Sequence, residues 1–299
     1  MTISNMVRYF MKFSYLGSQY RGIQKQNYGL NVRDNDTVQG VLETALRTVY
    51  PSAITEPKMT VSSRTDRGVH SLLSTAHVDL ELKDNAIHNS EEVLRQMNRF
   101  FVKCSHDIRL LNFIPVTKDF HARFSAKSRT YMYRFMVPKD LNNHKYPIIE
   151  GNYTPHIREP QLNIERMKAS LEMFLGYHDF ETFCSKRKGQ KDWRHCRRVL
   201  DMFILEEAQP LMPFDFLSHN HNYYQFKIKS KSFLYKQVRR MVGTVFALGK
   251  GIITEKDIET MLRIPSSAKY QGVVAEPHGL YLLNIEYDPD VLRKCRIET

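Results

Sequence analysis

The spacing of apolar residues changes several times along the first part of the chain. Apolar and aromatic side chains occupy every second position of segment 7–15, which is the period of a strand with one buried face. From about Asp36 to Val49 the spacing becomes that of an amphipathic helix, with Asp36 and Gln39 as a plausible capping pair. The same criteria predict strands near 58–63 and 75–82, a helix from about Ser90 and a strand over 108–114. This β-α-β-β-α-β order is that of a ferredoxin-like unit.

A similar order of elements follows in the second part of the chain, although we detect no sequence repeat. Tyr131, Tyr133, Phe135 and Val137 alternate as a strand, and a long polar excursion follows. The remaining patterns predict helices near 164–174, 231–249 and 255–263 and strands near 197–206, 223–229 and 280–287. We therefore predict an α+β fold of two ferredoxin-like (β-α-β-β-α-β) halves, residues 1–118 and 119–299, with joined antiparallel sheets, helices on one side and a basic central cleft.

The composition favours a polyanionic partner. The 299 residues include 44 Lys and Arg against 32 Asp and Glu, a net charge of +12, and phosphate neutralisation supplies most non-specific affinity for nucleic acids. The four cysteines lack a Cys-x-x-Cys pairing, and no apolar run reaches the length of about 18 residues that a membrane span needs. We therefore expect an intracellular protein, mitochondrial or cytoplasmic, with no membrane segment and no disulfide framework.

One short segment between two predicted strands carries two arginines beside one carboxylate. It reads Ser62-Ser63-Arg64-Thr65-Asp66-Arg67-Gly68-Val69-His70. From the residues alone, Asp66 fits a turn that its own side chain caps, because Gly and Asp are typical turn residues. The run Arg64-Thr65-Asp66-x-Gly68-Val69-His70, however, resembles the catalytic loop of the TruA-type tRNA pseudouridine synthases, in which the aspartate performs the chemistry.

Further motifs extend this resemblance over most of the chain. They are Tyr15-Leu16-Gly17-Ser18-x-Tyr20-x-Gly22-Ile23-Gln24, Thr37-Val38-Gln39-Gly40 with Leu42-Glu43-x-Ala45-Leu46, Phe120-His121-Ala122-Arg123-Phe124-Ser125-Ala126 with Arg129-Thr130-Tyr131-x-Tyr133, Gly176-x-His178-Asp179-Phe180, Phe233-Leu234-Tyr235-Lys236-Gln237-Val238-Arg239-Arg240-Met241-Val242-Gly243 and Gly279-Leu280-Tyr281-Leu282. Their number, order and spacing argue against chance agreement. Ser62-Ser63 before the loop and Ser232-Phe233-Leu234-Tyr235 with Arg239-Arg240 look most like the eukaryotic tRNA pseudouridine synthase-like branch. Three positions depart from the common family pattern: Ser63 replaces a glycine, Arg67 replaces a small residue, and Ile23 replaces a tryptophan.

The resemblance implies a cofactor-free isomerase that converts uridine to pseudouridine in tRNA, with Asp66 as the catalytic carboxylate. It implies that Arg239 keeps Asp66 charged, that Tyr131 stacks on the flipped uracil and helps remove the C5 proton, and that Leu280 packs against the base. Without the resemblance, Arg239 fits a solvated helix face, and Tyr131 and Leu280 fit a protein core. The expected target lies in or near the anticodon arm. A homodimer is plausible because bacterial members of the family are homodimers.

Basic residues near these motifs are candidates for RNA contact. Arg64 is expected to support the flipped backbone and Arg67 to bind phosphate, unless Arg67 crowds the pocket. Segment 185–198 is a basic run that contains the candidate substrate-binding residues Lys186, Arg187 and Lys188. A charge run also fits a solvated surface, so RNA contact here is a hypothesis.

Two functions of other classes stay open beside the isomerase. A catalytically silent tRNA-binding protein of the same fold would hold or remodel tRNA. The combination of Asp66, Tyr131 and Arg239 favours the enzyme, because a pure binder needs no carboxylate beside phosphates. A metal-dependent RNA hydrolase would need a metal site, and the spacing of Cys184, His195 and Cys196 fits no zinc-ligand pattern.

Overall fold

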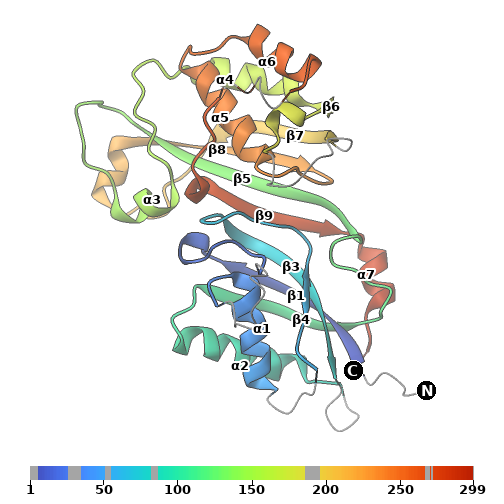
Figure 1. Ribbon diagram of the computed structural model, residues 1–299. Coiled ribbons are helices and arrows are strands. Elements are labelled where there is room, and N and C mark those ends of the chain that lie inside the picture. Colours follow the sequence, from blue (N-terminus) through green and yellow to red (C-terminus); the bar gives the residue numbers. More distant parts are fainter. Residues whose placement is uncertain are drawn as a thin grey trace. The chain divides into compact units, whose positions relative to one another are not determined.

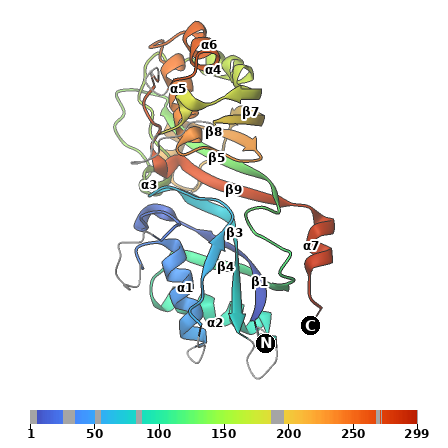
Figure 2. The same cartoon turned by 45° about the vertical axis from the view of Figure 1, so that its right-hand side comes forward.

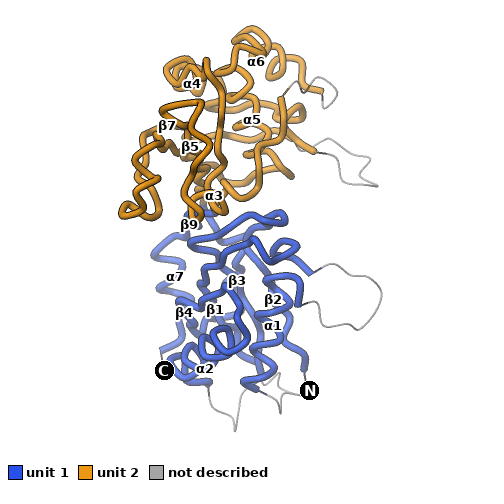
Figure 3. The backbone as a smooth tube through the Cα atoms, turned by 90° about the vertical axis from the view of Figure 1, so that its left-hand side faces the viewer, with its two compact units in different colours: residues 1–127, 282–299 blue, residues 128–281 orange. Residues whose placement is uncertain are grey.

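The fold divides into two compact units. A computed structural model describes residues 6–25, 35–50, 55–81, 87–185, 196–266, 270 and 272–298. Unit 1 consists of residues 1–127 and 282–299, and unit 2 of residues 128–281 (Figure 3). The described ranges contain seven α-helices and nine strands, which confirms the predicted α+β class. No helix in these ranges has both the length and the apolar character needed to cross a membrane.

The strands of unit 1 follow the ferredoxin-like order. They are β1 (Met6–Tyr15), β2 (Met59–Val61), β3 (His70–Glu81) and β4 (Ile108–Val116), in the order β4-β1-β3-β2. All three pairings are antiparallel. The last strand, β9 (Leu280–Tyr287), lies next to β3, and all of it except its first two residues belongs to this unit.

The two faces of this sheet have different covers. The helices α1 (Val38–Val49) and α2 (Ser90–Lys103) lie side by side along the strands (Figure 1). Tyr9, Met11 and Phe13 of β1 are buried in the same core as the apolar faces of these helices. Phe10 belongs to a second core, formed with residues after β4 and with the C-terminal helix α7 (Pro289–Cys295). Successive side chains of a strand point to opposite faces, so both faces of the sheet are covered.

The strands of unit 2 are also paired antiparallel. Its strands are β5 (Ala126–Pro138), β6 (Gly176–Asp179), β7 (Arg197–Glu207) and β8 (His221–Ser230), in the order β5-β8-β7-β6. Its helices are α3 (Ile148–Tyr153), α4 (Ile164–Ser170), α5 (Gln237–Gly249) and α6 (Glu255–Arg263). The helix α5 lies against the strands (Figure 2), and the ring centroids of Phe135 and Phe246 are 4.9 Å apart. Aromatic residues therefore join the helix to the sheet.

Several element boundaries differ from those predicted. The cap of α1 is Thr37 and not Asp36, because Thr37 directly precedes the first helical residue and its side chain accepts a hydrogen bond from the amide of Gly40 at 3.2 Å. The helix α5 begins at Gln237 and not directly after Ser230, because Lys236 has the left-handed φ of 60° and interrupts the helical path. The short elements β6 and α7 were not predicted. The domain limits of 1–118 and 119–299 stay a prediction.

A buried histidine on the second face of unit 1 predicts an acid-sensitive contact. The Nδ1 atom of His77 accepts a hydrogen bond from the amide of Ala122 at 3.1 Å, which requires an unprotonated Nδ1. Burial, and next the nearby Arg8, lower the pKa of His77 from 6.5 to about 4. The unfolded chain therefore takes up a proton at a higher pH than the folded chain. The stability that His77 contributes is lost as the pH falls from about 6.5 to about 4.

When the pH is lowered from 7.5 to 4.5, the free energy of unfolding should fall by about 1–2 kcal/mol more in wild type than in His77→Gln. The reason is that glutamine does not titrate. Urea unfolding at both pH values measures this difference. The exposed His144 offers the matched control, and His144→Gln should keep the wild-type pH dependence. An equal loss in wild type and His77→Gln would contradict the prediction.

Candidate active site

The loop 62–70 connects β2 and β3 of unit 1 and carries the predicted catalytic residue. Asp66 is partly exposed, whereas Arg64 and Arg67 on either side of it are exposed. Thr65 and His70 are buried. The loop therefore presents one carboxylate and two guanidinium groups outward, while uncharged residues anchor it to the unit.

Side chains and amides from the end of β1 hold this loop. The hydroxyl of Tyr15 lies 2.7 Å from Oγ1 of Thr65, and the amide of Ile23 donates to the carbonyl of Thr65 at 3.3 Å. The amide of Gly17 donates to Nδ1 of the buried His70 at 3.0 Å. These contacts fix the backbone on both sides of Asp66, and the resemblance had assigned none of them a role.

Two glycines allow the turn after β1 to approach the loop closely. An added Cβ on Gly17 would lie 2.0 Å from the carbonyl oxygen of Val69, which is far inside contact distance. Gly22 has the left-handed φ of 111°, and a Cβ there would lie 2.8 Å from the carbonyl oxygen of Thr65. Only glycine therefore fits at these two positions without a shift of the loop.

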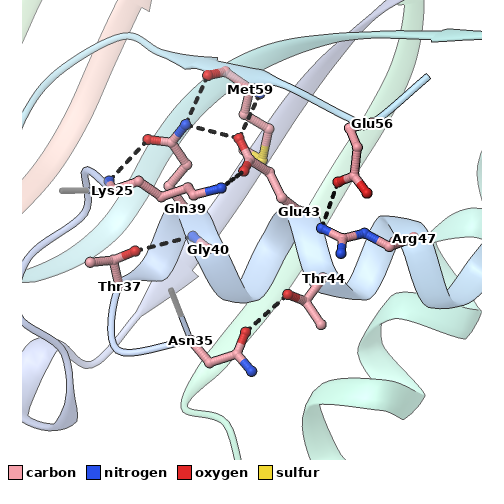
Figure 4. Close-up of polar contacts among 10 residues, drawn as sticks. All are labelled: Lys25, Asn35, Thr37, Gln39, Gly40, Glu43, Thr44, Arg47, Glu56 and Met59. Carbon is pink, nitrogen blue, oxygen red and sulfur yellow. Dashed lines mark hydrogen bonds and ion pairs between the residues drawn. The ribbon is translucent and has the colours of Figure 1, made fainter. Parts of the chain in front are cut away.

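A buried polar network holds β2, the strand that leads into the loop (Figure 4). The side chain of Glu43 on α1 is 5% exposed. It accepts hydrogen bonds from the amide of Met59 at 2.9 Å, from Nε2 of Gln39 at 2.9 Å and from Nζ of Lys25 at 3.0 Å. Gln39 also donates to the carbonyl of Met59 at 3.1 Å. Because Met59 begins β2, Gln39 and Glu43 are positioning residues for the loop.

Replacing Glu43 with leucine should destabilise unit 1 by about 2–4 kcal/mol, because the buried Met59 amide and Gln39 side chain would lose their acceptor. Chemical unfolding measures the loss. Arg47 on the same helix forms an ion pair at 2.8 Å with Glu56, whose side chain is 61% exposed. Arg47→Ala should therefore cost less than about 1 kcal/mol. Similar losses in both variants would contradict the role of Glu43.

The other predicted site residues belong to unit 2. Tyr131 on β5 is 5% exposed, and its ring is perpendicular to that of Phe233 at 5.2 Å. Leu280, the first residue of β9, is buried. Arg239 on α5 is partly exposed, as expected, and its Nε donates to the carbonyl of Ala275 at 2.7 Å. The amide of Ala275 donates back to the carbonyl of Arg239 at 3.1 Å.

The neighbour of Arg239 anchors the start of the basic run. Arg240 donates to the carbonyls of Thr182 and Cys184 at 2.9 and 2.8 Å, and its guanidinium lies 4.3 Å from the centre of the Tyr270 ring. Burial lowers the pKa of Arg240 below its usual range. The predicted RNA-binding residues Lys186, Arg187 and Lys188 lie outside the described residues.

Comparison with known proteins identifies the family. The family described as tRNA pseudouridine synthase matches residues 171–288. The tRNA pseudouridine synthase-like 1 of Xenopus laevis is 34% identical over 286 residues, which cover 95% of this chain and 93% of that protein. The human tRNA pseudouridine synthase-like 1 is 31% identical over 296 residues, which cover 97% of this chain and 93% of the human protein. The tRNA pseudouridine synthase A of Dinoroseobacter shibae is 31% identical over 285 residues, which cover 95% of this chain and 98% of the bacterial protein. The chain therefore belongs to the tRNA pseudouridine synthase family.

Proposed function

We propose that this protein isomerises uridine to pseudouridine in the anticodon arm of tRNA, with Asp66 as the catalytic carboxylate. Membership of the family makes it an isomerase that acts on tRNA. The observation that carries the assignment of Asp66 is the loop 62–70, which Tyr15 and Gly17 hold through Thr65 and His70 while Asp66 stays partly exposed. A rigid loop with an accessible carboxylate suits a group that acts on a bound nucleotide.

The reaction sets few requirements on the protein. The bond between N1 of uracil and C1′ of the ribose breaks, the base turns, and C5 bonds to C1′. The proton on C5 leaves and N1 gains one, so substrate and product have the same composition. An ionised carboxylate beside C1′ promotes the first step, and Arg64 and Arg67 on the same loop offer cations to the neighbouring phosphates.

The flipped base needs walls as well as a carboxylate. Extrusion of a base costs a few kcal/mol, and stacking on an aromatic ring returns about 1–3 kcal/mol. Tyr131 is the ring in this proposal and its hydroxyl helps to remove the C5 proton, while Leu280 supplies the opposite wall. Arg239 is the third residue that the proposal assigns to the reaction. The ordered surroundings of Tyr131 and Arg239, through Phe233 and Ala275, support these roles.

Tritium release tests this function. Transcripts of total tRNA, labelled with tritium at C5 of uridine, should release tritium on incubation with the full chain and stay intact, and the product should map to the anticodon arm. Intact binding without release on any transcript would favour the silent tRNA-binding alternative. Cleaved RNA that a chelator protects would favour the hydrolase. The homodimer and the mitochondrial or cytoplasmic location stay predictions.

A further inference from the structure

An exposed aromatic ring in unit 1 has no place in the proposed reaction. Phe124 is 75% exposed, although phenylalanine is usually buried. The ring of His121 lies beside it, with 4.3 Å between centroids and 34° between planes. The guanidinium carbon of Arg123 lies 5.7 Å from the centre of the Phe124 ring. His121, Arg123 and Phe124 together form a small aromatic and cationic surface, which we call the Phe124 platform.

The Phe124 platform stands on an ordered turn. The amides of Arg123 and Phe124 donate to Nδ1 of His121 at 3.2 and 3.3 Å. The amide of Ser125 donates to the carbonyl of His121 at 2.8 Å, and the amide of His121 donates to the hydroxyl of Ser125 at 3.1 Å. Ala122, between the platform residues, is fully buried. The ring is therefore presented by a fixed backbone, and binding a ligand there needs little ordering of the turn.

The Phe124 platform is separate from the catalytic loop. The turn is tied to β3 at His77, whose Nδ1 accepts from the amide of Ala122. His77 lies seven positions along β3 from His70, where the loop ends, and a strand rises about 3.3 Å per residue. The loop joins β3 at His70 and the platform turn contacts β3 at His77, so these two points are about 23 Å apart along the strand. A ligand on the platform is a different group from the uridine at Asp66.

We propose that the Phe124 platform stacks an unpaired base of the RNA substrate, away from the target uridine. The proposal rests on the proposed function in so far as the ligand is the same tRNA. Aromatic rings beside arginine are the usual stacking surface for unpaired bases. Segment 117–127 carries Lys118, Arg123 and Lys127 against the single carboxylate of Asp119, and Lys127 forms an ion pair with Asp288 at 2.8 Å. The net positive charge of the segment fits a nucleic acid better than an apolar protein surface.

Binding of full-length tRNA tests the Phe124 platform. Phe124→Ala should weaken binding about 5- to 150-fold, the usual value of one stacked base, and Phe124→Trp should restore it. A short RNA hairpin, in which about three base pairs close the loop with the target uridine, has a stem of only about 10 Å. Phe124→Ala should therefore bind this hairpin as wild type does. Phe214→Ala is the matched control, because Phe214 is 93% exposed but lies in unit 2 beside Asp215.

Three results would overturn the Phe124 platform. One is unchanged tRNA binding by Phe124→Ala. Another is an equal loss with the short hairpin, which would place the ring at the target base. The third is a loss of tRNA binding by Phe124→Ala that accompanies a change in its molar mass in solution, which would assign the ring to contact with a second copy of the chain. Wild type that binds tRNA without tritium release would contradict only the proposed function, because platform binding is measured separately.

Discussion

Replacing Asp66 with asparagine is expected to lower the rate of pseudouridine formation by at least about 10³-fold. Asparagine has nearly the same shape as aspartate, but it carries no negative charge and offers no carboxylate oxygen to the ribose. The contacts that fix the loop, from Tyr15 and Ile23 to Thr65 and from Gly17 to His70, do not use the Asp66 side chain. The loss should therefore lie in the chemical step, and single-turnover tritium release measures it.

Two measurements separate this loss from damage to the fold or to RNA binding. Asp66→Asn should bind tRNA with the wild-type dissociation constant and unfold at the wild-type urea concentration. Asp36, in the same unit, forms an exposed ion pair with Arg21 at 3.4 Å, and Asp36→Asn should keep the wild-type rate. A rate within tenfold of wild type for Asp66→Asn would contradict the catalytic role and return Asp66 to that of a turn cap.

The elements that the sequence predicted well are those with a strong local period. The alternation of 7–15 lies within β1, and the helical spacing near 255–263 has the bounds of α6. The pattern in β1 reflects the face that packs with α1 and α2, and the pattern in α6 reflects its buried side. The cap at Thr37 was missed because Asp36 and Gln39 offered a competing signal one residue earlier. The strand β6 has only 4 residues, too few for a period to be recognised.

The supports of the candidate site could not be predicted in the same way, because they join segments far apart in the chain. Asp66 was found through the residue types and spacing around it. The role of Glu43 depends on Met59, 16 positions later, and that of Gly17 on a loop about 50 positions later. One local feature pointed to this network. Gln39 and Glu43 are four positions apart, so they are neighbours on the surface of a helix whose other buried residues are mostly apolar.

The second large effect is expected at Gly17, a residue with no reactive group. An alanine Cβ there would lie 2.0 Å from the carbonyl oxygen of Val69, so either the turn or the loop must move by about 1 Å or more to reach ordinary contact. The same movement strains the bond from the Gly17 amide to His70. A shift of about 1 Å in a catalytic group costs about 10²-fold in rate. Gly17→Ala should therefore lower the turnover rate about 100-fold, as measured by tritium release at saturating tRNA.

A glycine in unit 2 separates this positioning effect from general loss of stability. Gly176 has the left-handed φ of 84°, and an added Cβ there would meet no atom within 4 Å. Backbone strain alone should lower the free energy of unfolding of Gly176→Ala by about 1–2 kcal/mol. This is close to the loss of about 1–3 kcal/mol expected from overpacking in Gly17→Ala. If the loop must hold Asp66 in place, only Gly17→Ala lowers the turnover rate at a temperature where both variants are folded. Equal rates in the two variants would mean that the contact between the turn and the loop serves stability alone.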